Sequence, residues 1–112
     1  MTTPPLAQRK CTPCEGGASP LPLSAAQTLL KDLRGWELVE GKRLRKQMTC
    51  KNFLDAVNLI QRIAPVAEAE DHHPDLHLTN YRRLTIELST HAIGGLSEND
   101  FILAAKIDQL LT

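Results

Sequence analysis

The chain has 112 residues, 42% of them hydrophobic and 23% charged, with a formal net charge of +0 at pH 7. This length and composition are typical of a single globular domain, and the balanced charge disfavours a general nucleic-acid or membrane-surface binder. No apolar run approaches the roughly 20 residues of a membrane-spanning helix, and the opening MTTPPLAQRK lacks the apolar stretch of a secretory signal.

Residues 1–22 differ in composition from the rest of the chain. Five of the seven prolines lie there, together with Gly16 and Gly17. Proline removes a backbone donor, and glycine raises the entropy cost of ordering the chain. We therefore expect a flexible, Pro/Gly-rich N-terminal arm over residues 1–22, followed by one domain over residues 23–112.

A helix and a hairpin are expected at the start of the domain. Ser24 is placed to cap the helix and Gly35 to end it. Residues 36–39 and 43–48 have the composition of two strands, and Glu40-Gly41 between them predicts a tight turn.

A second helix is expected over about residues 52–70. Its apolar residues recur every three or four positions, which predicts one buried stripe. The residues of that stripe are Phe53, Val57, Ile60, Ala64 and Ala67. Pro65 lies within it and is expected to kink or break the helix.

Two further strands follow, one short at residues 76–79 and one longer at residues 81–90. In the longer strand apolar and polar residues alternate, so one set is expected to face the core. The inward set is Leu84, Ile86 and Leu88, while Tyr81 and His91 fall on the opposite, polar side.

The last helix is expected to begin after a turn at Gly94-Gly95. Ser97 and Asp100 have the spacing of a capping box, which marks a helix start. The buried stripe of this helix is expected to include Phe101, Ala104, Ala105, Ile107, Asp108 and Leu111.

The order of elements, α-β-β-α-β-β-α, predicts an α+β fold. Hairpin connections imply a four-stranded antiparallel sheet, and its single apolar face requires the three helices to pack on that face. The other face and the sheet edges then remain open. Self-association through sheet pairing or helix packing is the expected remedy.

All four histidines lie between positions 72 and 91. Histidine transfers protons near neutral pH and binds metals, so acid–base catalysis, a metal site and a binding pocket without chemistry all remain open. A structural alternative is that the helix dipole favours His72 and His73 at the end of the second helix. That alternative does not account for His91.

The histidines belong to a longer pattern of spaced residues. It consists of Glu68-Ala-Glu-Asp71-His72-His73-Pro74, then Tyr81, Ser89-Thr90-His91, Gly94-Gly95-Leu96 and Asp100. This pattern resembles the pterin-4a-carbinolamine dehydratases, also called 4a-hydroxytetrahydrobiopterin dehydratases. The resemblance runs from the first helix to the C-terminus.

The resemblance implies an enzyme that removes water from 4a-hydroxytetrahydrobiopterin to give quinonoid dihydropterin, without metal or other cofactor. It also implies assembly as a homodimer or homotetramer. His72 and His91 match the acid–base pair, and His73 matches a residue that binds or orients the pterin. The residues implied to hold the ring, tune the histidines or fix their loop are Glu68, Asp71, Pro74, Ser89 and Thr90.

Two supporting residues have alternative explanations. Asp100 belongs to the pattern, but a capping role at a helix start explains it equally. Tyr81 fits a wall of the pterin site, and packing in a core or interface explains it as well. His77 falls outside the pattern and is expected to be an exposed strand residue.

A second functional class follows from the stretch His73-Pro-Asp-Leu-His-Leu-Thr-Asn80. It is similar to a branch of dehydratase-like proteins in carbon-fixing organisms that are thought to act as RuBisCO assembly factors. In that case the partner is the RuBisCO large subunit and the location is cytoplasmic with carboxysome association; otherwise a cytoplasmic location is expected. Cys11 and Cys14 form a lone C-x-x-C, for which the sequence offers no second half of a zinc site.

Overall fold

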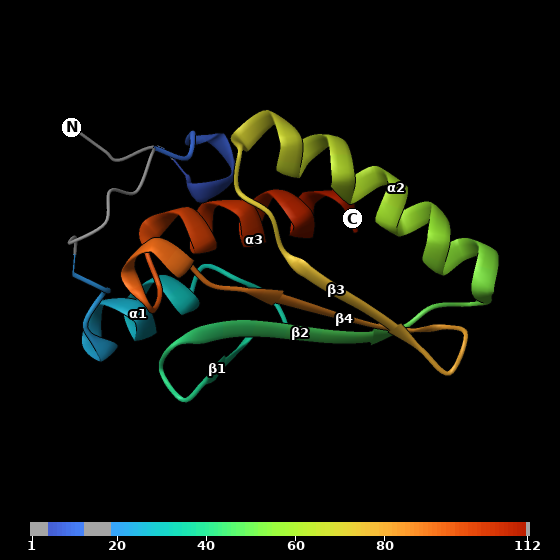
Figure 1. The fold of residues 1–112 in the computed structure, drawn as a ribbon, viewed down its shortest axis with the longest axis horizontal. Helices are drawn as coiled ribbons and strands as arrows, with labels where there is room; N and C mark the ends of the chain where they lie inside the picture. Colours follow the sequence, from blue (N-terminus) through green and yellow to red (C-terminus); the bar gives the residue numbers. More distant parts are fainter. Residues whose placement is uncertain (1–4, 13–18, 112) are drawn as a thin grey trace.

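The computed structural model describes residues 5–12 and 19–111. Their order of helices and strands is the predicted one, with two short 3₁₀ helices added (Figure 1). The elements are η1 (Leu6–Gln8), α1 (Leu23–Leu30), β1 (Glu37–Val39), β2 (Arg43–Thr49), α2 (Phe53–Glu70), β3 (Asp75–Thr79), β4 (Arg83–Leu88), η2 (His91–Ile93) and α3 (Glu98–Leu110).

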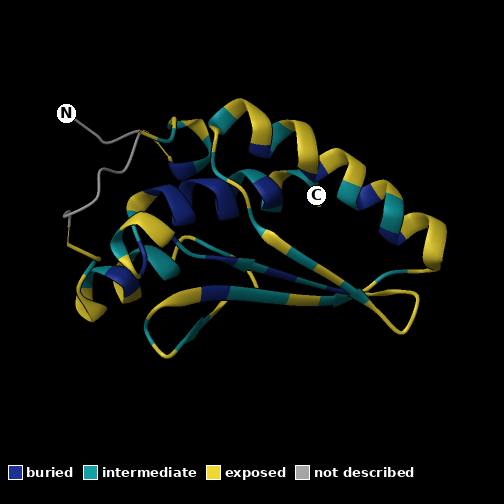
Figure 2. Cartoon of the chain, viewed as in Figure 1, coloured by how far each residue is buried: buried dark blue, intermediate teal, exposed yellow. Residues whose placement is uncertain are grey.

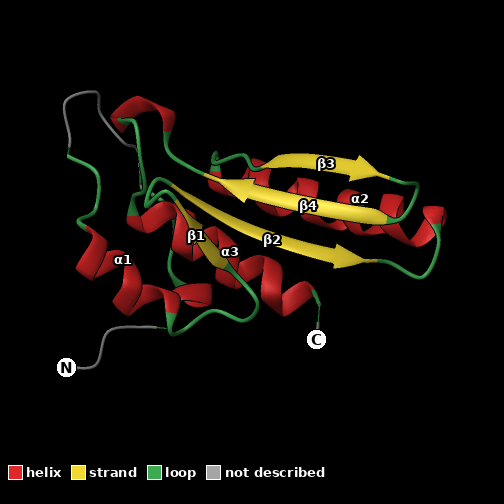
Figure 3. Cartoon of the chain, turned by 90° about the horizontal axis from the view of Figure 1, so that it is seen from below, coloured by secondary structure: helices red, strands yellow, loops and turns green. Residues whose placement is uncertain are grey.

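The four strands form one antiparallel sheet in the order β1-β2-β4-β3. Helices α2 and α3 cover one face of this sheet and lie behind it in Figure 3, while α1 packs at the end near β1. The predicted inward set on β4, Leu84, Ile86 and Leu88, is buried. The α+β fold inferred from the sequence is therefore confirmed.

Helix α3 is the centre of the core. It is buried over most of its circumference (Figure 2) because it lies between the sheet, α2 and η1. The expected burial of Phe101, Ala104, Ala105 and Ile107 is confirmed. Leu111 is exposed, since α3 ends at Leu110 and the next residue lies beyond its packed turns.

The buried stripe of α2 was predicted wrongly. The buried residues are Ala56, Leu59, Ile63 and Ala67, of which only Ala67 belonged to the predicted set. Apolar residues occur on two adjoining stripes of this helix, and packing against α3 and the sheet places Leu59 and Ile63 inward. Periodicity shows that a helix has an apolar face, but it cannot choose between two such stripes.

Pro65 does not break α2, which continues to Glu70. Pro65 and Gln61 both lie on the exposed side of the helix. Because proline removes the bond that the carbonyl four residues earlier would accept, that carbonyl is left to water at little cost.

The helices α1 and α2 begin differently, and the cap predicted for α1 is not formed. Asn52 caps α2, its side chain accepting from the Asp55 N–H at 2.8 Å. Ser24 does not cap α1, because the helix already begins at Leu23 behind an extended Pro22. Gly35 has a left-handed φ of 75°, but it lies in turns beyond the last residue of α1.

Both hairpins turn on two residues with positive φ. Glu40 and Gly41 have positive φ in the connection 40–42 between β1 and β2, where the turn was predicted, and Asn80 and Tyr81 have positive φ in the connection 80–82 between β3 and β4. The prediction that Tyr81 starts the long strand is therefore wrong: it lies in the turn and is 58% exposed. His91 also lies outside the strand, in η2.

Part of the region assigned to an arm packs on the domain. Leu6 of η1 is buried in the main core, and η1 lies beside α3 near the end of α2 (Figure 1). Residues 13–18, which include Cys14 of the C-x-x-C pair, lie outside the described residues. The domain boundary and the flexibility of the arm remain predictions.

None of the helices in the described part of the chain has the length and apolar character needed to cross a membrane.

Candidate active site

A cavity of about 570 Å³ lies where the end of α2, the end of β4, η2 and the start of α3 meet the N-terminal segment. Three of the four histidines line it, together with other polar residues. The lining residues are Cys11, Thr12, Ala69, Glu70, Asp71, His72, His73, Ser89, Thr90, His91, Ala92 and Asn99.

Asp71 determines how the chain enters the cavity. It ends α2 in the left-handed conformation, with φ 49°. This reverses the chain within one residue, because the next N–H, that of His72, bonds back to the Ala67 carbonyl at 3.2 Å. Asp and Asn tolerate this conformation better than most residues.

His72 is fixed by the buried carboxylate of Asp100. Its Nε2 lies 2.6 Å from Asp100 Oδ1, and the Asp100 side chain is fully buried. The other oxygen, Oδ2, accepts from the Thr90 hydroxyl at 2.8 Å and from the Ser97 N–H at 3.0 Å. A carboxylate that accepts from three sides holds the imidazole in one orientation.

Both explanations of Asp100 therefore apply to one side chain. It forms the capping box of α3 with Ser97, and it also contacts His72. The network closes through Thr90, whose Oγ1 lies 2.7 Å from Ser97 Oγ. The helix start and the cavity wall are thus one hydrogen-bonded unit.

His73 and His91 are held less firmly. His73 Nε2 lies 2.6 Å from Glu68 Oε1, but both side chains are exposed, so water competes for this contact. His91 begins η2, which ends at Gly94 in the left-handed conformation and returns the chain to a bridge between Thr90 and Gly95. His73 and His91 are both exposed, unlike His72.

Four of the predicted site residues do not line the cavity: Glu68, Pro74, Tyr81 and Asp100. Asp100 lies behind the wall and contacts His72 and Thr90, which do line it. Glu68 contacts the cavity only through His73, Pro74 lies in the connection to β3, and Tyr81 lies in the β3–β4 turn. His77 is paired with Glu87 across the sheet at 3.2 Å, as an exposed strand residue would be.

Six residues of the cavity wall were not predicted as site residues: Cys11, Thr12, Ala69, Glu70, Ala92 and Asn99. Cys11 and Thr12 lie in the assumed arm, and their contacts join positions far apart in the chain. Glu70 directly precedes Asp71 and Asn99 directly precedes Asp100, so adjacency to predicted residues was the one available signal.

Cys11 faces this wall as an uncharged thiol. Burial raises its pKa to about 12, and the negative charge and hydrogen bond of Glu70 act in the same direction. Cys11 therefore adds no charge to the cavity at neutral pH.

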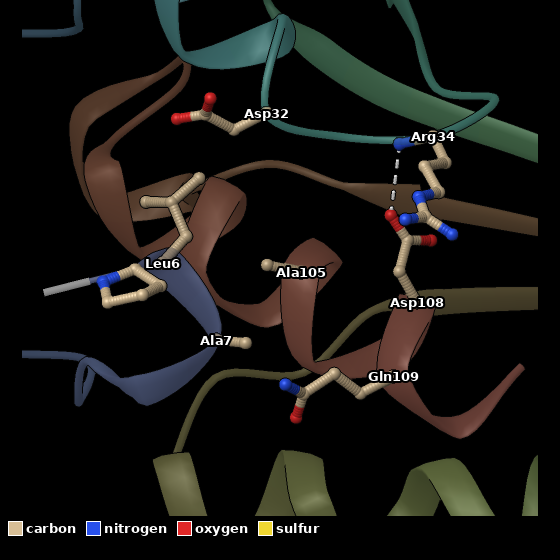
Figure 4. A pocket seen from close by; sticks show the side chains of 8 residues that line it. Leu6, Ala7, Asp32, Arg34, Ala105, Asp108 and Gln109 are labelled. Atoms are coloured by element: carbon tan, nitrogen blue, oxygen red, sulfur yellow. Dashed lines mark hydrogen bonds between the residues drawn. The ribbon is translucent and has the colours of Figure 1, made fainter. Parts of the chain in front are cut away.

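A second hollow of about 380 Å³ lies on the other side of η1 (Figure 4). Its polar wall includes Asp108, but that carboxylate already accepts from the Arg34 N–H, the Trp36 indole and Lys46. No histidine lines this hollow. It therefore lacks the groups that make the first cavity a candidate for proton transfer.

A third, smaller hollow of about 260 Å³ adjoins the first. Ser89, Thr90 and His91 line both. Its far side is formed by Glu40 and Lys42 of the β1–β2 turn and by Arg43, the first residue of β2. His91 is thus accessible from two sides.

Comparison with known proteins identifies related chains. Residues 19–110 match the family model described as Pterin 4 alpha carbinolamine dehydratase. A protein of Nitrosomonas eutropha that carries a provisional name as a pterin-4-alpha-carbinolamine dehydratase is 49% identical over 107 residues, which cover 95% of this chain and 93% of that protein.

Two further comparisons extend the range of relatives. The mitochondrial pterin-4-alpha-carbinolamine dehydratase 2 of Arabidopsis thaliana is 44% identical over 109 residues, covering 94% of this chain and 58% of its own length. A crystal structure described as a transcriptional coactivator/pterin dehydratase from Brucella melitensis matches with a TM-score of 0.77 at 29% identity, over 84% of this chain and 100% of that chain.

Proposed function

The chain belongs to the pterin 4 alpha carbinolamine dehydratase family, and on that premise we propose that it removes water from a 4a-hydroxytetrahydropterin. The observation that carries the proposal is that His72, His73 and His91 line one cavity. The cavity volume of about 570 Å³ lies within the size range of small-molecule sites.

The reaction requires two proton movements and one bond cleavage. The bond between ring carbon 4a and the hydroxyl oxygen breaks, and the oxygen leaves as water after gaining a proton. A ring nitrogen loses a proton, which leaves a quinonoid dihydropterin. A pair of imidazoles suits this exchange because one can accept a proton while the other donates.

His72 is the better oriented of the two proposed acid–base residues. Its Nε2–H donates to Asp100, whose other carboxylate oxygen already accepts hydrogen bonds from the Thr90 hydroxyl and the Ser97 N–H. This bond leaves Nδ1 of His72 as the ring nitrogen that exchanges a proton with the substrate. Asp100 acts here as a positioning residue.

His91 is the proposed partner and His73 a binding residue. His91 is exposed on η2 and is reached from two adjoining hollows, which suits a group that exchanges its proton with solvent. Asp71, Ser89 and Thr90 also line the cavity and are proposed to contact the pterin. Glu68 supports this role by holding His73.

The test is the rate of dehydration of a 4a-hydroxytetrahydropterin generated in the assay. The purified protein should accelerate the reaction above its spontaneous rate, and His72→Ala should lower kcat by about 100-fold or more, because positioned acid–base groups contribute factors of this size. His77→Ala removes a histidine from the outer sheet face and serves as the matched control. No acceleration by the parent protein, or equal loss in both variants, would refute the proposal.

The assembly-factor alternative, with the RuBisCO large subunit as partner, stays a prediction. So do the homodimer or homotetramer, the cytoplasmic location and the carboxysome association.

A further inference from the structure

We propose that Cys11 and Thr12 form part of the pterin-binding wall of this cavity, and that Asn99 and Glu70 are the positioning residues that hold them there. This inference rests on the proposed function, because it takes a pterin as the ligand. It concerns residues 5–12, which lie outside the range that the family model matches.

Thr12 and Asn99 form a reciprocal pair. The Thr12 N–H donates to Asn99 Oδ1 at 2.9 Å, and Asn99 Nδ2 donates to the Thr12 carbonyl at 2.5 Å. Asn99 is only 5% exposed, so water competes poorly for these bonds. An amide side chain that satisfies both backbone groups of one residue fixes the position and the direction of the chain at that point.

Cys11 is held by Glu70, the last residue of α2. Its N–H donates to Glu70 Oε1 at 2.7 Å, and its thiol lies 3.6 Å from the Asn99 carbonyl. Because the bond from Cys11 to a carboxylate is charge-assisted, it is among the stronger contacts of this segment. The segment is thus joined to the end of α2 and to the start of α3.

A further anchor holds the segment before it reaches the cavity. Leu6 is buried in the main core, and Lys106 of α3 donates to the Ala7 carbonyl at 2.9 Å. These contacts lie outside the cavity, so they anchor the segment without depending on a ligand.

The N-terminal segment 5–12 and His72 are held by residues that are neighbours in the sequence. Asn99, which holds Thr12, precedes Asp100, which holds His72. Glu70, which holds Cys11, lies two residues before His72. The wall formed by Cys11 and Thr12 therefore keeps a set position relative to the proposed acid–base residue.

The chemistry of this wall suits a neutral heterocycle. Thr12 offers a hydroxyl, and Cys11 offers a thiol that stays protonated at neutral pH because burial and Glu70 raise its pKa to about 12. The charge of Glu70 is directed to the Cys11 N–H and lies 3.9 Å from Lys106. A pterin ring is uncharged near neutral pH. Such a wall can fit the ring and form hydrogen bonds with it, and binding does not require a charged group of the wall to lose its water.

The test separates the backbone contact from the side chain. Thr12→Pro removes the N–H that Asn99 accepts, whereas Thr12→Val keeps that N–H and the side-chain shape. The full-length variants are titrated with 7,8-dihydrobiopterin, whose fluorescence reports binding, and are assayed for KM and kcat. We expect Thr12→Pro to raise Kd and KM about tenfold with little change in kcat, since leaving the amide oxygen of the buried Asn99 without its donor has a cost of that order. Thr12→Val removes only the hydroxyl of the wall and keeps the contact with Asn99, so it should raise Kd by less than Thr12→Pro does.

Asn99→Leu breaks the same pair from the other side while preserving the shape of the side chain. It should raise Kd at least as much as Thr12→Pro does, and the double variant Thr12→Pro/Asn99→Leu should be no worse than Asn99→Leu alone, because that variant already removes both bonds of the pair. Additive losses in the double variant, or unchanged Kd in folded single variants, would overturn the inference. Circular dichroism and the Tm show which variants fold.

The two proposals fail in different ways. If His72→Ala abolishes activity while the Thr12 and Asn99 variants bind pterin like the parent, only the inference about the wall is wrong. If the parent binds the pterin but does not accelerate dehydration, the enzymatic function is wrong and Kd still decides the role of the wall. A parent that binds no pterin contradicts both.

Discussion

Asp100 concentrates two roles in one buried side chain, which caps α3 and orients His72. Asp100→Asn keeps the size of the side chain but gives it one acceptor and one donor. With its oxygen kept toward the Ser97 N–H, its NH₂ faces His72 Nε2 and favours the tautomer with the proton on Nδ1. We expect kcat to fall roughly tenfold or more, as for other orienting carboxylates, and the free energy of unfolding to fall by about 1–3 kcal/mol. Nitrogen NMR shifts of His72 report the tautomer.

Asp108→Asn is the matched control for this prediction. Asp108 is the next carboxylate along α3, and it too accepts from several donors, including Lys46 at 2.8 Å. Its removal should lower stability without changing the His72 tautomer. An equal fall in kcat in both variants would show that Asp100 acts only through stability.

At the residue scale, the sequence predicted the histidines better than their surroundings. His72, His73 and His91 were suspected because histidines cluster between positions 72 and 91, and all three line the cavity. Thr12 and Asn99 carried no such signal. Their contact spans 87 positions, and neither residue type is unusual in a loop or a helix start.

At the scale of elements, the β3–β4 turn holds an unfavourable residue. Tyr81 has a φ of 52° in the position after Asn80, and a bulky side chain is disfavoured there. Tyr81→Gly creates the Asn-Gly pair that such hairpin turns prefer. We expect the free energy of unfolding to rise by about 1 kcal/mol, with the unfolded-state entropy of glycine offsetting part of the gain. A urea titration measures it, and a fall in stability would show that packing of the Tyr81 ring outweighs its backbone cost.

Gly41→Ala tests the same reasoning in the opposite direction, because it should lower the free energy of unfolding where Tyr81→Gly should raise it. Gly41 has a φ of 68° in the β1–β2 turn, so alanine there should lower stability.

Element types were more predictable than their limits. The alternation in β4 requires one face to be buried, and that single constraint located Leu84, Ile86 and Leu88 correctly. Tyr81 was assigned to the strand because it continues the alternation, although it lies in the three-residue connection 80–82 between β3 and β4. In α2, apolar residues on two stripes left the choice to tertiary packing, which the sequence pattern does not contain.

At the scale of the whole molecule, the layer order followed from elementary constraints. Four short strands with one apolar face must be covered by helices, and hairpins make the sheet antiparallel. The strand order β1-β2-β4-β3 was not predicted, because it places β4 between β2 and β3 by contacts between distant segments. The packing of Leu6 in the core was also missed, because the prolines and glycines of residues 1–22 gave this segment the composition of a flexible arm.

The molecule retains an exposed apolar end. Phe53 and Leu54, in the first turn of α2, are 55% and 65% exposed. They lie at the same end as the β3–β4 turn, to which this region is tied by the bond from the Cys50 N–H to the Arg82 carbonyl (Figures 1 and 3). Adjacent large apolar side chains in water favour burial against another surface. They support the prediction of self-association that the open sheet also suggested.

Phe53→Glu/Leu54→Glu tests whether this end takes part in self-association. Acidic residues are favourable in the first turn of a helix, so the double variant should fold. If the parent is a dimer or tetramer, we expect the variant to shift toward smaller species at equal concentration, because burying two carboxylates in an apolar contact is costly. Sedimentation velocity over a range of concentrations measures the shift. Ser24→Glu/Gln27→Glu adds the same charge on α1, at the opposite end of the molecule in Figure 1, and should leave the distribution unchanged. An equal shift in both variants would assign the effect to net charge, and no shift in either would place the contact elsewhere.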